Sequence, residues 1–213
     1  FMGRGQDLGA QFFISQRTIG ADISFTEPYF LERNLAFGFD IFRRERDFTD
    51  EGGFGTRETG FRIRLGWRIP EELTQSVAYE VNDKRVRNIS DSASPLIKAE
   101  EGKTTVTQIA TTLTYDTRDN RFLPTEGFVI SGTVGYGAPP GSLHYVKGVI
   151  RGAYHYTVTP GWVVSVLGEA GMVEGIGSQR VRLNERFFLG GDSLRAFRFG
   201  GVGPRDRITG DSL

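Results

Sequence analysis

The sequence predicts an all-β protein: an antiparallel up-and-down transmembrane β-barrel, of which this chain is a part. Apolar and polar residues alternate with a period of two along much of the chain, as in strands whose two faces meet different surroundings. The 213 residues include 29 glycines and 17 phenylalanines. No stretch approaches the ~20 consecutive apolar residues of a transmembrane helix. Because only helices and closed barrels satisfy their backbone polar groups in lipid, a membrane protein of this composition is expected to be a barrel.

The first three strands are expected at residues 8–16, 19–26 and 35–44. Each carries apolar side chains at every second position, with small or polar residues between them. Successive side chains of a strand point to opposite faces, so each segment has one apolar face. The apolar positions are Leu8, Ala10, Phe12 and Ile14, then Ala21, Ile23 and Phe25, then Leu35, Phe37, Phe39 and Ile41.

The clearest strand is expected at 57–69, and a weaker one follows at 74–83. In the clear one an apolar residue stands at every second position, and three arginines lie among the residues between them. A helix would mix these residues around its circumference, so the pattern indicates a strand. The two sets are Phe61, Ile63, Leu65, Trp67 and Ile69, and Arg62, Arg64, Gly66 and Arg68.

Four more alternating segments complete the pattern, at 104–117, 127–137, 143–158 and 161–172. About nine strands of ~8–12 residues result, a length that spans a bilayer when the strand is tilted.

The connections differ in length at the two ends of these strands. Compact turns stand at 27–30, 70–72, 122–127 and 159–161, and carry turn-forming residues. Longer polar stretches stand between them, at 45–56, 83–103, 138–142 and 173–183. Short periplasmic turns and long extracellular loops are typical of outer-membrane barrels, so the turns containing proline are expected to face the periplasm.

Two soluble alternatives also show alternation. A β-sandwich has shorter strands, nearer 5–6 residues, and a solvated outer face. A lipocalin-like barrel would hold its apolar residues inside, and the row of Arg62, Arg64 and Arg68 would then be costly, whereas a water-filled lumen tolerates charges. The pattern therefore favours the membrane barrel. Single-chain bacterial barrels have an even strand number, so an odd count suggests strands beyond both ends of this chain.

Composition and spacing give no support to an enzyme, a metal site or a cofactor. His144 and His155 stand eleven residues apart on one expected strand, too far for a shared metal ion. The run from Gly190 to Ser193 lacks the strand–turn–helix context of a nucleophile elbow. There is no cysteine, phosphate loop or dinucleotide fingerprint, and a formal net charge of zero argues against a nucleic-acid partner.

Three stretches go beyond general barrel patterning. They are residues 1–8 followed by 24–30; 115–120 followed by 122–127; and 187–197 followed by 203–206. In this order they resemble the barrel of the family of outer-membrane protein assembly factors, the BamA family, which also includes translocation-and-assembly barrels and, more distantly, two-partner secretion transporters and chloroplast import pores. The Phe-x-Gly-x-Gly start and the Pro28-Tyr29-Phe30 turn favour the assembly factors over the transporters.

The resemblance implies a sixteen-stranded barrel, of which this chain holds the third to eleventh strands and most of the sixth extracellular loop. That loop, expected at 173–213, would fold into the lumen. In the family its Arg-Gly-aromatic motif packs against acidic residues of the inner wall. Carried over to this sequence, the loop motif comprises Gly190, Gly191, Leu194, Arg195, Ala196, Phe197, Gly203, Pro204, Arg205 and Asp206.

Ala196 departs from the family pattern, because it stands where the motif has glycine. Glycine is needed where φ is positive or where another chain passes close by, so Ala196 implies either an ordinary backbone conformation or strain. The arginine would be Arg195 and the aromatic residue Phe197. A guanidinium can bind a carboxylate through two parallel hydrogen bonds. The acidic partners of Arg195 are expected on strands beyond Leu213.

A second motif, in the turn after the strand at 104–117, comprises Asp116, Arg118, Asp119, Pro124 and Gly127. We expect it to shape a charged periplasmic turn through local hydrogen bonds and to perform no chemistry.

The resemblance implies a function: assembly and insertion of β-barrel proteins into the bacterial cell outer membrane, without enzymatic activity or cofactor. Its expected partners are unfolded outer-membrane protein clients, periplasmic assembly lipoproteins and outer-membrane lipids, and no nucleic acid. The alternative is a polypeptide secretion pore of the two-partner type; five soluble periplasmic repeats upstream would favour the assembly factor, and two the transporter. A passive porin is a third possibility.

Overall fold

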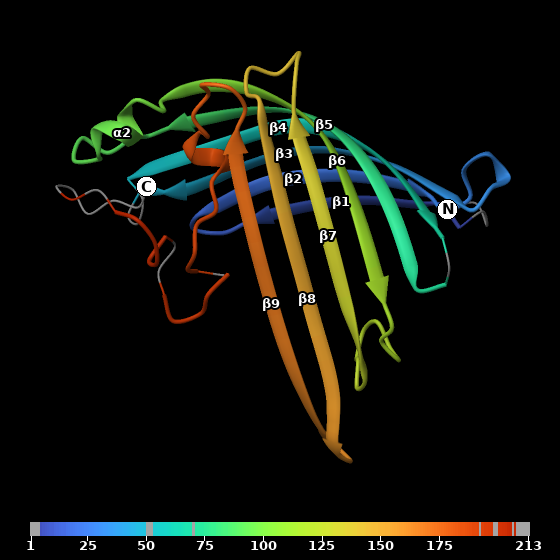
Figure 1. Ribbon diagram of the computed structural model, residues 1–213. Helices are drawn as coiled ribbons and strands as arrows, with labels where there is room; N and C mark the ends of the chain where they lie inside the picture. The colour runs from blue at the N-terminus through green and yellow to red at the C-terminus, as the bar shows by residue number, and fades with distance from the viewer. Residues whose placement is uncertain are drawn as a thin grey trace.

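A computed structural model of the chain describes residues 5–49, 53–69, 71–191, 193–197, 200–205 and 207. In these residues nine strands form one antiparallel sheet in which each strand pairs with the next along the chain (Figure 1). The strands are β1 (Asp7–Ile14), β2 (Thr18–Glu27), β3 (Leu35–Phe48), β4 (Phe54–Arg68), β5 (Leu73–Arg87), β6 (Gly102–Asp116), β7 (Gly127–Gly137), β8 (Tyr145–Thr159) and β9 (Trp162–Gly175).

The strands pair in a register that places apolar residues next to apolar residues and polar residues next to polar ones. The alternation seen in the sequence therefore gives continuous rows of side chains across the sheet. One row of directly paired residues crosses eight strands and is apolar throughout: Leu8, Phe25, Phe39, Ile63, Tyr79, Ile109, Tyr136 and Val146. The neighbouring row, on the other face, is polar or small up to its last member: Gly9, Ser24, Asp40, Arg62, Glu80, Gln108, Gly137 and Tyr145. The sheet thus has an apolar face and a polar face.

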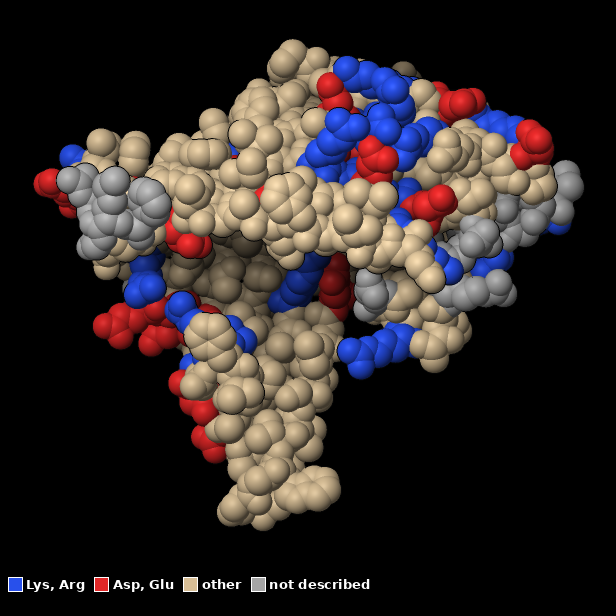
Figure 2. All heavy atoms as spheres, turned by 180° about the vertical axis from the view of Figure 1, so that it is seen from behind, with Lys and Arg blue, Asp and Glu red and all other residues tan. Residues whose placement is uncertain are grey.

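The polar face lies on the inside of the curve. Residues from β3 to β8 and from the segment after β9 line one hollow of about 380 Å³ on this face, so the strands bend around it. Figure 2, which shows the molecule from behind, has a hollow beneath the arch with basic and acidic side chains inside it. The apolar face is the outer one, and large side chains such as Phe12, Ile150 and Trp162 are exposed on it.

The expected strand ends were wrong on one side of the sheet. The sequence placed the end of β3 at residue 44 and the start of β4 at 57, but β3 continues to Phe48 and β4 begins at Phe54. Similarly, β5 continues to Arg87 and β6 begins at Gly102. Charged residues in these stretches suggested loops; however, the strands pair with each other along the added length, which satisfies their backbone groups wherever they stand relative to lipid.

The longer connections gather at the end of the sheet that carries α2 (Pro95–Lys98), a single turn capped by the Ser94 hydroxyl. A small apolar cluster forms there on the polar face, from Phe54, Val86, Ala93, Ile97 and Leu183. Leu183 comes from the segment after β9, where η2 (Leu183–Glu185) forms one 3₁₀ turn. The start of that segment therefore packs on the inner wall. Among the described residues no helix is long and apolar enough to cross a membrane.

Candidate functional site: the inner wall and the segment packed on it

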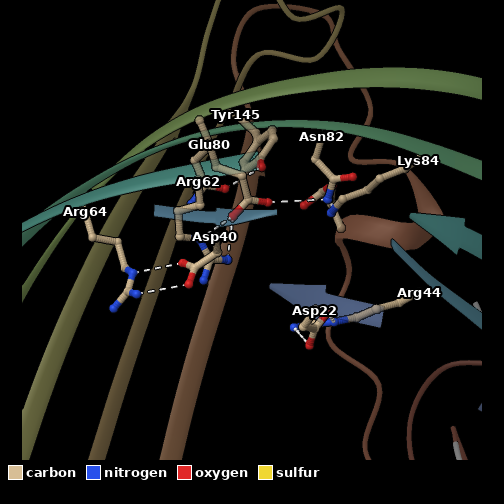
Figure 3. A network of polar contacts seen from close by, with 11 residues as sticks. Asp22, Asp40, Arg44, Arg62, Arg64, Glu80, Asn82, Lys84 and Tyr145 are labelled. Carbon is tan, nitrogen blue, oxygen red and sulfur yellow. Dashed lines mark hydrogen bonds and ion pairs between the residues drawn. The ribbon is translucent and has the colours of Figure 1, made fainter. Parts of the chain in front are cut away.

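Ion pairs cross the inner wall from strand to strand, as Figure 3 shows. On β3, Arg44 donates to both carboxylate oxygens of Asp22 on β2, at 3.0 and 2.7 Å. The Asp40 carboxylate, also on β3, lies 2.8 and 3.0 Å from the Nε and Nη2 atoms of Arg64 on β4. These two arginine–carboxylate contacts each join neighbouring strands through a rigid guanidinium fork, so they fix the wall as well as neutralising it.

The next pair continues the same line. Arg62 on β4 donates its Nε to Glu80 on β5 at 2.8 Å, and Asn82 donates to the other oxygen of Glu80 at 3.3 Å. The sequence predicted Arg62 and Arg64 to line the lumen. They do line the polar face, and each has a carboxylate partner on an adjacent strand. The wall of this part of the barrel is therefore a paired network rather than a row of free cations.

Gly137 is needed where the inner wall meets Tyr145. The Tyr145 ring lies across the glycine, so that a Cβ at residue 137 would stand 2.5 Å from the nearest ring carbon. From there the Tyr145 hydroxyl donates to the Gln108 side chain at 2.7 Å. A side chain at 137 would push the ring away and break this bond between β8 and β6.

The segment after β9 contacts the wall through Glu185. This carboxylate is only 2% exposed and lies 2.5 Å from the Lys84 ammonium on β5, which is itself 13% exposed. Lys147 on β8 donates to the backbone oxygen of Glu185 at 3.3 Å, and its ammonium stands 4.7 Å from the centre of the Phe187 ring. We call residues 183–188 the loop base. It joins β5 and β8 across the inside of the sheet.

The loop motif expected from the resemblance follows the loop base directly. Its described part is held by its own backbone: Gly191 N–H donates to the Phe197 oxygen at 2.8 Å, and Phe197 N–H donates to the Leu194 oxygen at 3.4 Å. Ser193 adds side-chain hydrogen bonds to both backbone groups of Gly190, at 3.1 and 3.0 Å. The structure thus shows a compact turn in the described residues 190–191 and 193–197.

Within that turn Arg195 and Phe197 are exposed, and Arg195 has no ion pair among the described residues. Ala196 has φ of +74°, in the left-handed region that glycine favours. Of the two possibilities that the sequence left open, ordinary backbone or strain, the structure shows the strained one. An L-residue there costs roughly 1–2 kcal/mol because Cβ approaches the following carbonyl oxygen.

The remaining positions of the loop motif lie farther along the chain. Gly203 has φ of +137°, and Arg205 donates to the backbone oxygens of Gly200 and Gly201, at 3.4 and 3.1 Å. A single backbone bridge joins Leu189 to Val202 and so brings the two parts of the motif together. Pro204 is exposed. Asp206 lies outside the described residues, as do residues 1–4 of the first motif.

The turn motif after β6 forms a network of local hydrogen bonds. Arg118 donates two hydrogen bonds of 2.8 Å to the Asp116 carboxylate. Asp119 accepts from the Thr125 hydroxyl at 2.6 Å and from the backbone N–H groups of Thr125 and Glu126, at 2.9 and 3.1 Å. These local hydrogen bonds hold the connection between β6 and β7 together. The sequence predicted local hydrogen bonds in this turn.

Two consequences follow for that turn. The hydrogen bond from Thr125, followed by the backbone N–H groups of Glu126 and Thr125, holds the pKa of the Asp119 carboxyl well below its usual range. Gly127 has φ of +95°, and a Cβ there would stand 2.4 Å from the Thr117 backbone oxygen. The turn therefore depends on an ionised Asp119 and on glycine at 127. Pro124 lies half-buried in the same turn.

Sequence reasoning missed Glu185, although it makes the most buried charge contact of the described chain. Alternation could have identified half of the contact, because it places Lys84 and Lys147 on the inner face. Nothing marks Glu185 itself, since it lies in a segment without periodicity. Within the described ranges, no group of three His, Asp or Glu side chains is placed to hold a metal ion.

The outward apolar face, the ion-paired inner face and a loop segment packed inside define the wall of a transmembrane β-barrel. The comparison with known proteins gives the family: the Omp85 superfamily domain matches residues 1–213, and the chain belongs to this superfamily. The outer membrane protein assembly factor BamA of Nitratidesulfovibrio vulgaris is 28% identical over 99% of this chain and 27% of its own length. A SAM50-like protein of Drosophila melanogaster, CG7639, is 26% identical over 95% of this chain and 48% of its own length.

The fold is also similar to that of a solved structure. The crystal structure of BamA from Haemophilus ducreyi lacking POTRA domains 1–3 superposes with a TM-score of 0.81 at 18% identity, over 95% of this chain and 42% of that one. The predicted family and the predicted barrel fold are thus confirmed. The chain spans less than half the length of each of these relatives.

Proposed function

We propose that the protein carrying this chain assembles β-barrel proteins and inserts them into the bacterial outer membrane. The observation that carries the proposal is the match of the Omp85 superfamily domain to all 213 residues, because the relatives include proteins named as outer membrane protein assembly factors. The wall fits this role, since its described residues form an ion-paired scaffold that joins neighbouring strands.

In this proposal the described sheet is the stable wall of the machine. The resemblance assigns the work to the seam between the first and last strands of the barrel, where weak pairing offers a strand edge to a client. A rigid wall supports such a mechanism, because opening at one seam requires that the other strand pairs stay closed. The cross-strand pairs Asp22–Arg44, Asp40–Arg64 and Arg62–Glu80 supply that rigidity here.

The partners follow from the same role. We propose that unfolded outer-membrane protein clients bind at the seam, that periplasmic lipoproteins assist at the turn end, and that outer-membrane lipids surround the apolar face. The free energy for insertion would come from the folding of the client itself, without nucleotide or cofactor.

Depletion of the full-length protein, followed by complementation, tests the proposal. Loss of the protein should lower the level of heat-modifiable, folded outer-membrane proteins of many kinds, and purified protein in liposomes should accelerate client folding. Loss of one secreted polypeptide alone would instead identify a two-partner secretion pore. A steady ion conductance without effect on client folding would identify a porin.

For the loop motif, we propose that Arg195 binds an acidic residue on the inner wall of the complete barrel. Its exposure in the described turn, beside a loop base that already lies inside, supports this. In the full-length protein Arg195→Ala should lower barrel stability or client assembly, whereas Arg180→Ala, at an exposed arginine of the same loop, should not. Unchanged heat-modifiability and normal client levels in Arg195→Ala would contradict a docked motif.

A further inference from the structure

The outer face carries a group of charged side chains at the end of the sheet that bears α2. Figure 2 shows basic and acidic side chains gathered there, at the upper right, next to a surface that is otherwise largely uncharged. We call this group the outer basic cluster. It consists of Arg43 and Glu45 on β3, Arg57 on β4, Asp83, Arg85 and Arg87 on β5, and Lys103 on β6.

The cluster faces the same way as the apolar rows, not into the lumen. Ile41 and Phe61 are paired across β3 and β4 on the apolar face, and the next pair on that face is Arg43 with Thr59. The pair after that is Glu45 with Arg57. Because side chains alternate along a strand, these residues lie on one surface in direct continuation of the apolar band.

The distance along the strand places the cluster at the edge of the membrane. From Phe61 on β4 to Ile69, the first residue after the strand, the apolar row covers eight residue steps, which at ~3.3 Å per residue is about 26 Å. Tilted by ~40°, that row spans about 20 Å across the membrane, close to the ~25 Å apolar band of outer-membrane barrels. Arg57 and Thr59 therefore stand where hydrocarbon gives way to headgroups.

Positive charge exceeds negative charge here: the cluster has five basic and two acidic side chains, and Asp47, the next residue on the same face of β3, adds a third acidic one. Arg43, Arg57 and Arg87 all contact the same carboxylate, Glu45, with Nη2 and Nε of the first two at 3.4 and 2.6 Å. One carboxylate cannot neutralise three guanidinium groups. Lys103 pairs with Asp83 at 2.9 Å, which also accepts from the Thr105 hydroxyl.

Four basic side chains and the Asp83 carboxylate surround a depression. It measures about 270 Å³ and is lined by Arg43, Arg57, Thr59, Asp83, Arg85 and Lys103. The side chains of Arg43 and Lys103 are 59% and 53% exposed, and Arg85 is exposed without an ion pair among the described residues. Guanidinium and ammonium groups around a pocket of this kind provide hydrogen-bond donors for a tetrahedral phosphate.

We infer that the outer basic cluster binds the phosphate of an anionic membrane lipid, in the leaflet at the loop end of the barrel. A lipid is the ligand that fits both parts of the surface. Its phosphate would lie among Arg43, Arg57 and Arg85, while its acyl chains would run along the apolar band that begins at Ile41 and Phe61, both exposed on this face. A free phosphate or an acidic polypeptide would use only the charged part. The inference rests on the membrane position of the sheet and not on the assembly activity.

The test uses the full-length protein, purified in detergent and titrated separately with phosphatidic acid, phosphatidylcholine, inorganic phosphate and an acidic peptide. Native mass spectrometry measures the bound ligand. Wild-type protein should retain phosphatidic acid in preference to phosphatidylcholine. The double variant Arg43→Gln/Arg85→Gln should lose roughly ten- to thirtyfold in that affinity, since each basic group near a membrane surface contributes about one kcal/mol.

A matched control removes two exposed arginines at the opposite end, Arg33→Gln/Arg121→Gln. It should bind phosphatidic acid as the wild type does, and both variants should show the heat-modifiable migration of a folded barrel. Equal binding of both phospholipids, or equal affinity of the two double variants, would overturn the inference. So would inorganic phosphate that binds as tightly as the lipid, or an acidic peptide that binds in place of phosphatidic acid. Client assembly is measured in parallel, so that failure of lipid binding with normal assembly affects this inference alone.

Discussion

The loop base and the loop motif are adjacent in the chain, yet different forces hold them. Residues 183–188 place Leu183 in an apolar cluster and Glu185 against Lys84, both with almost no exposed surface. The described residues of 190–197 are held mostly by hydrogen bonds among themselves, with one more from the Ser193 hydroxyl to the Phe188 backbone oxygen of the loop base at 3.4 Å. Their large side chains Leu194 and Phe197 are 39% and 51% exposed. The first segment depends on buried contacts with the wall of the barrel, whereas the second is shaped mainly by its own hydrogen bonds, and its Ser193 shares a depression with residues of β7, β8 and β9.

This difference teaches which residues set the position of the loop and which remain available for binding. A segment with buried apolar and ionic contacts stays in place, because leaving the wall exposes its side chains and unpairs a buried charge. A compact turn with exposed side chains keeps its local shape and still offers its surface. Arg195 belongs to the compact turn of the loop motif, which follows the fixed loop base in the chain.

The largest effect is expected from Glu185→Gln, which leaves Lys84 buried without a counter-charge. Breaking a buried ion pair from one side costs about 3 kcal/mol or more in free energy of unfolding. The unfolding midpoint of the full-length barrel, followed by its heat-modifiable migration, should fall clearly. The double variant Lys84→Met/Glu185→Leu should recover most of the loss, because it removes both charges. If it is as unstable as Glu185→Gln, the ion pair is not the cause.

Leu183→Ala should follow, at about 2–3 kcal/mol, because it opens a cavity among Phe54, Val86 and Ile97. Leu194→Ala makes the same chemical change in the loop motif. There the side chain is 39% exposed, so the expected loss is within about 0.5 kcal/mol. Denaturant unfolding of the two variants measures the contrast directly. Equal losses would show that the motif is buried as deeply as the base in the complete barrel.

Ala196→Gly should stabilise the loop motif by about 1 kcal/mol, because it relieves an L-residue at φ of +74°. Gly191→Ala is the opposite change in the same turn, at φ of +62°, and should cost about as much. Hydrogen exchange of the amides in this turn reports both changes. A destabilising Ala196→Gly would mean that the entropy gained by the unfolded chain outweighs the strain.

Much of the fold could be predicted from the sequence, because a strand with one apolar and one polar face shows apolar and polar residues in alternation. The alternation from Phe61 to Ile69 is enough to indicate which face of β4 is apolar and to place Arg62 and Arg64 toward the lumen. The strand ends near Arg43 and Arg57 could not be predicted in the same way. Charged residues there end the apolar band, but they do not end the strand, since backbone pairing continues past the hydrocarbon.

The sequence could suggest residues for the candidate site, but it could not predict which residues contact each other there. Motif order predicts Arg195, Phe197 and the Asp116–Arg118 turn as site residues, and the alanine at 196 raised the question of strain. No periodicity governs the segment after β9, so the sequence could not show that Glu185 meets Lys84, about a hundred residues away in the chain. Such a contact depends on how the sheet curves, which alternation does not encode.

Ser193→Ala should have a small effect that is confined to the loop motif, at about 0.5–1 kcal/mol. It removes the hydroxyl that accepts from the Gly190 N–H and donates to the Gly190 and Phe188 backbone oxygens, while water can replace part of these bonds at an exposed residue. The loss should be local: amides of 190–197 should exchange faster, and the global unfolding midpoint should not move. The loop motif would then open without the loop base. If Ser193→Ala lowers the global midpoint as Glu185→Gln does, the two segments unfold as one unit, and the distinction between a fixed base and an independently folded motif fails.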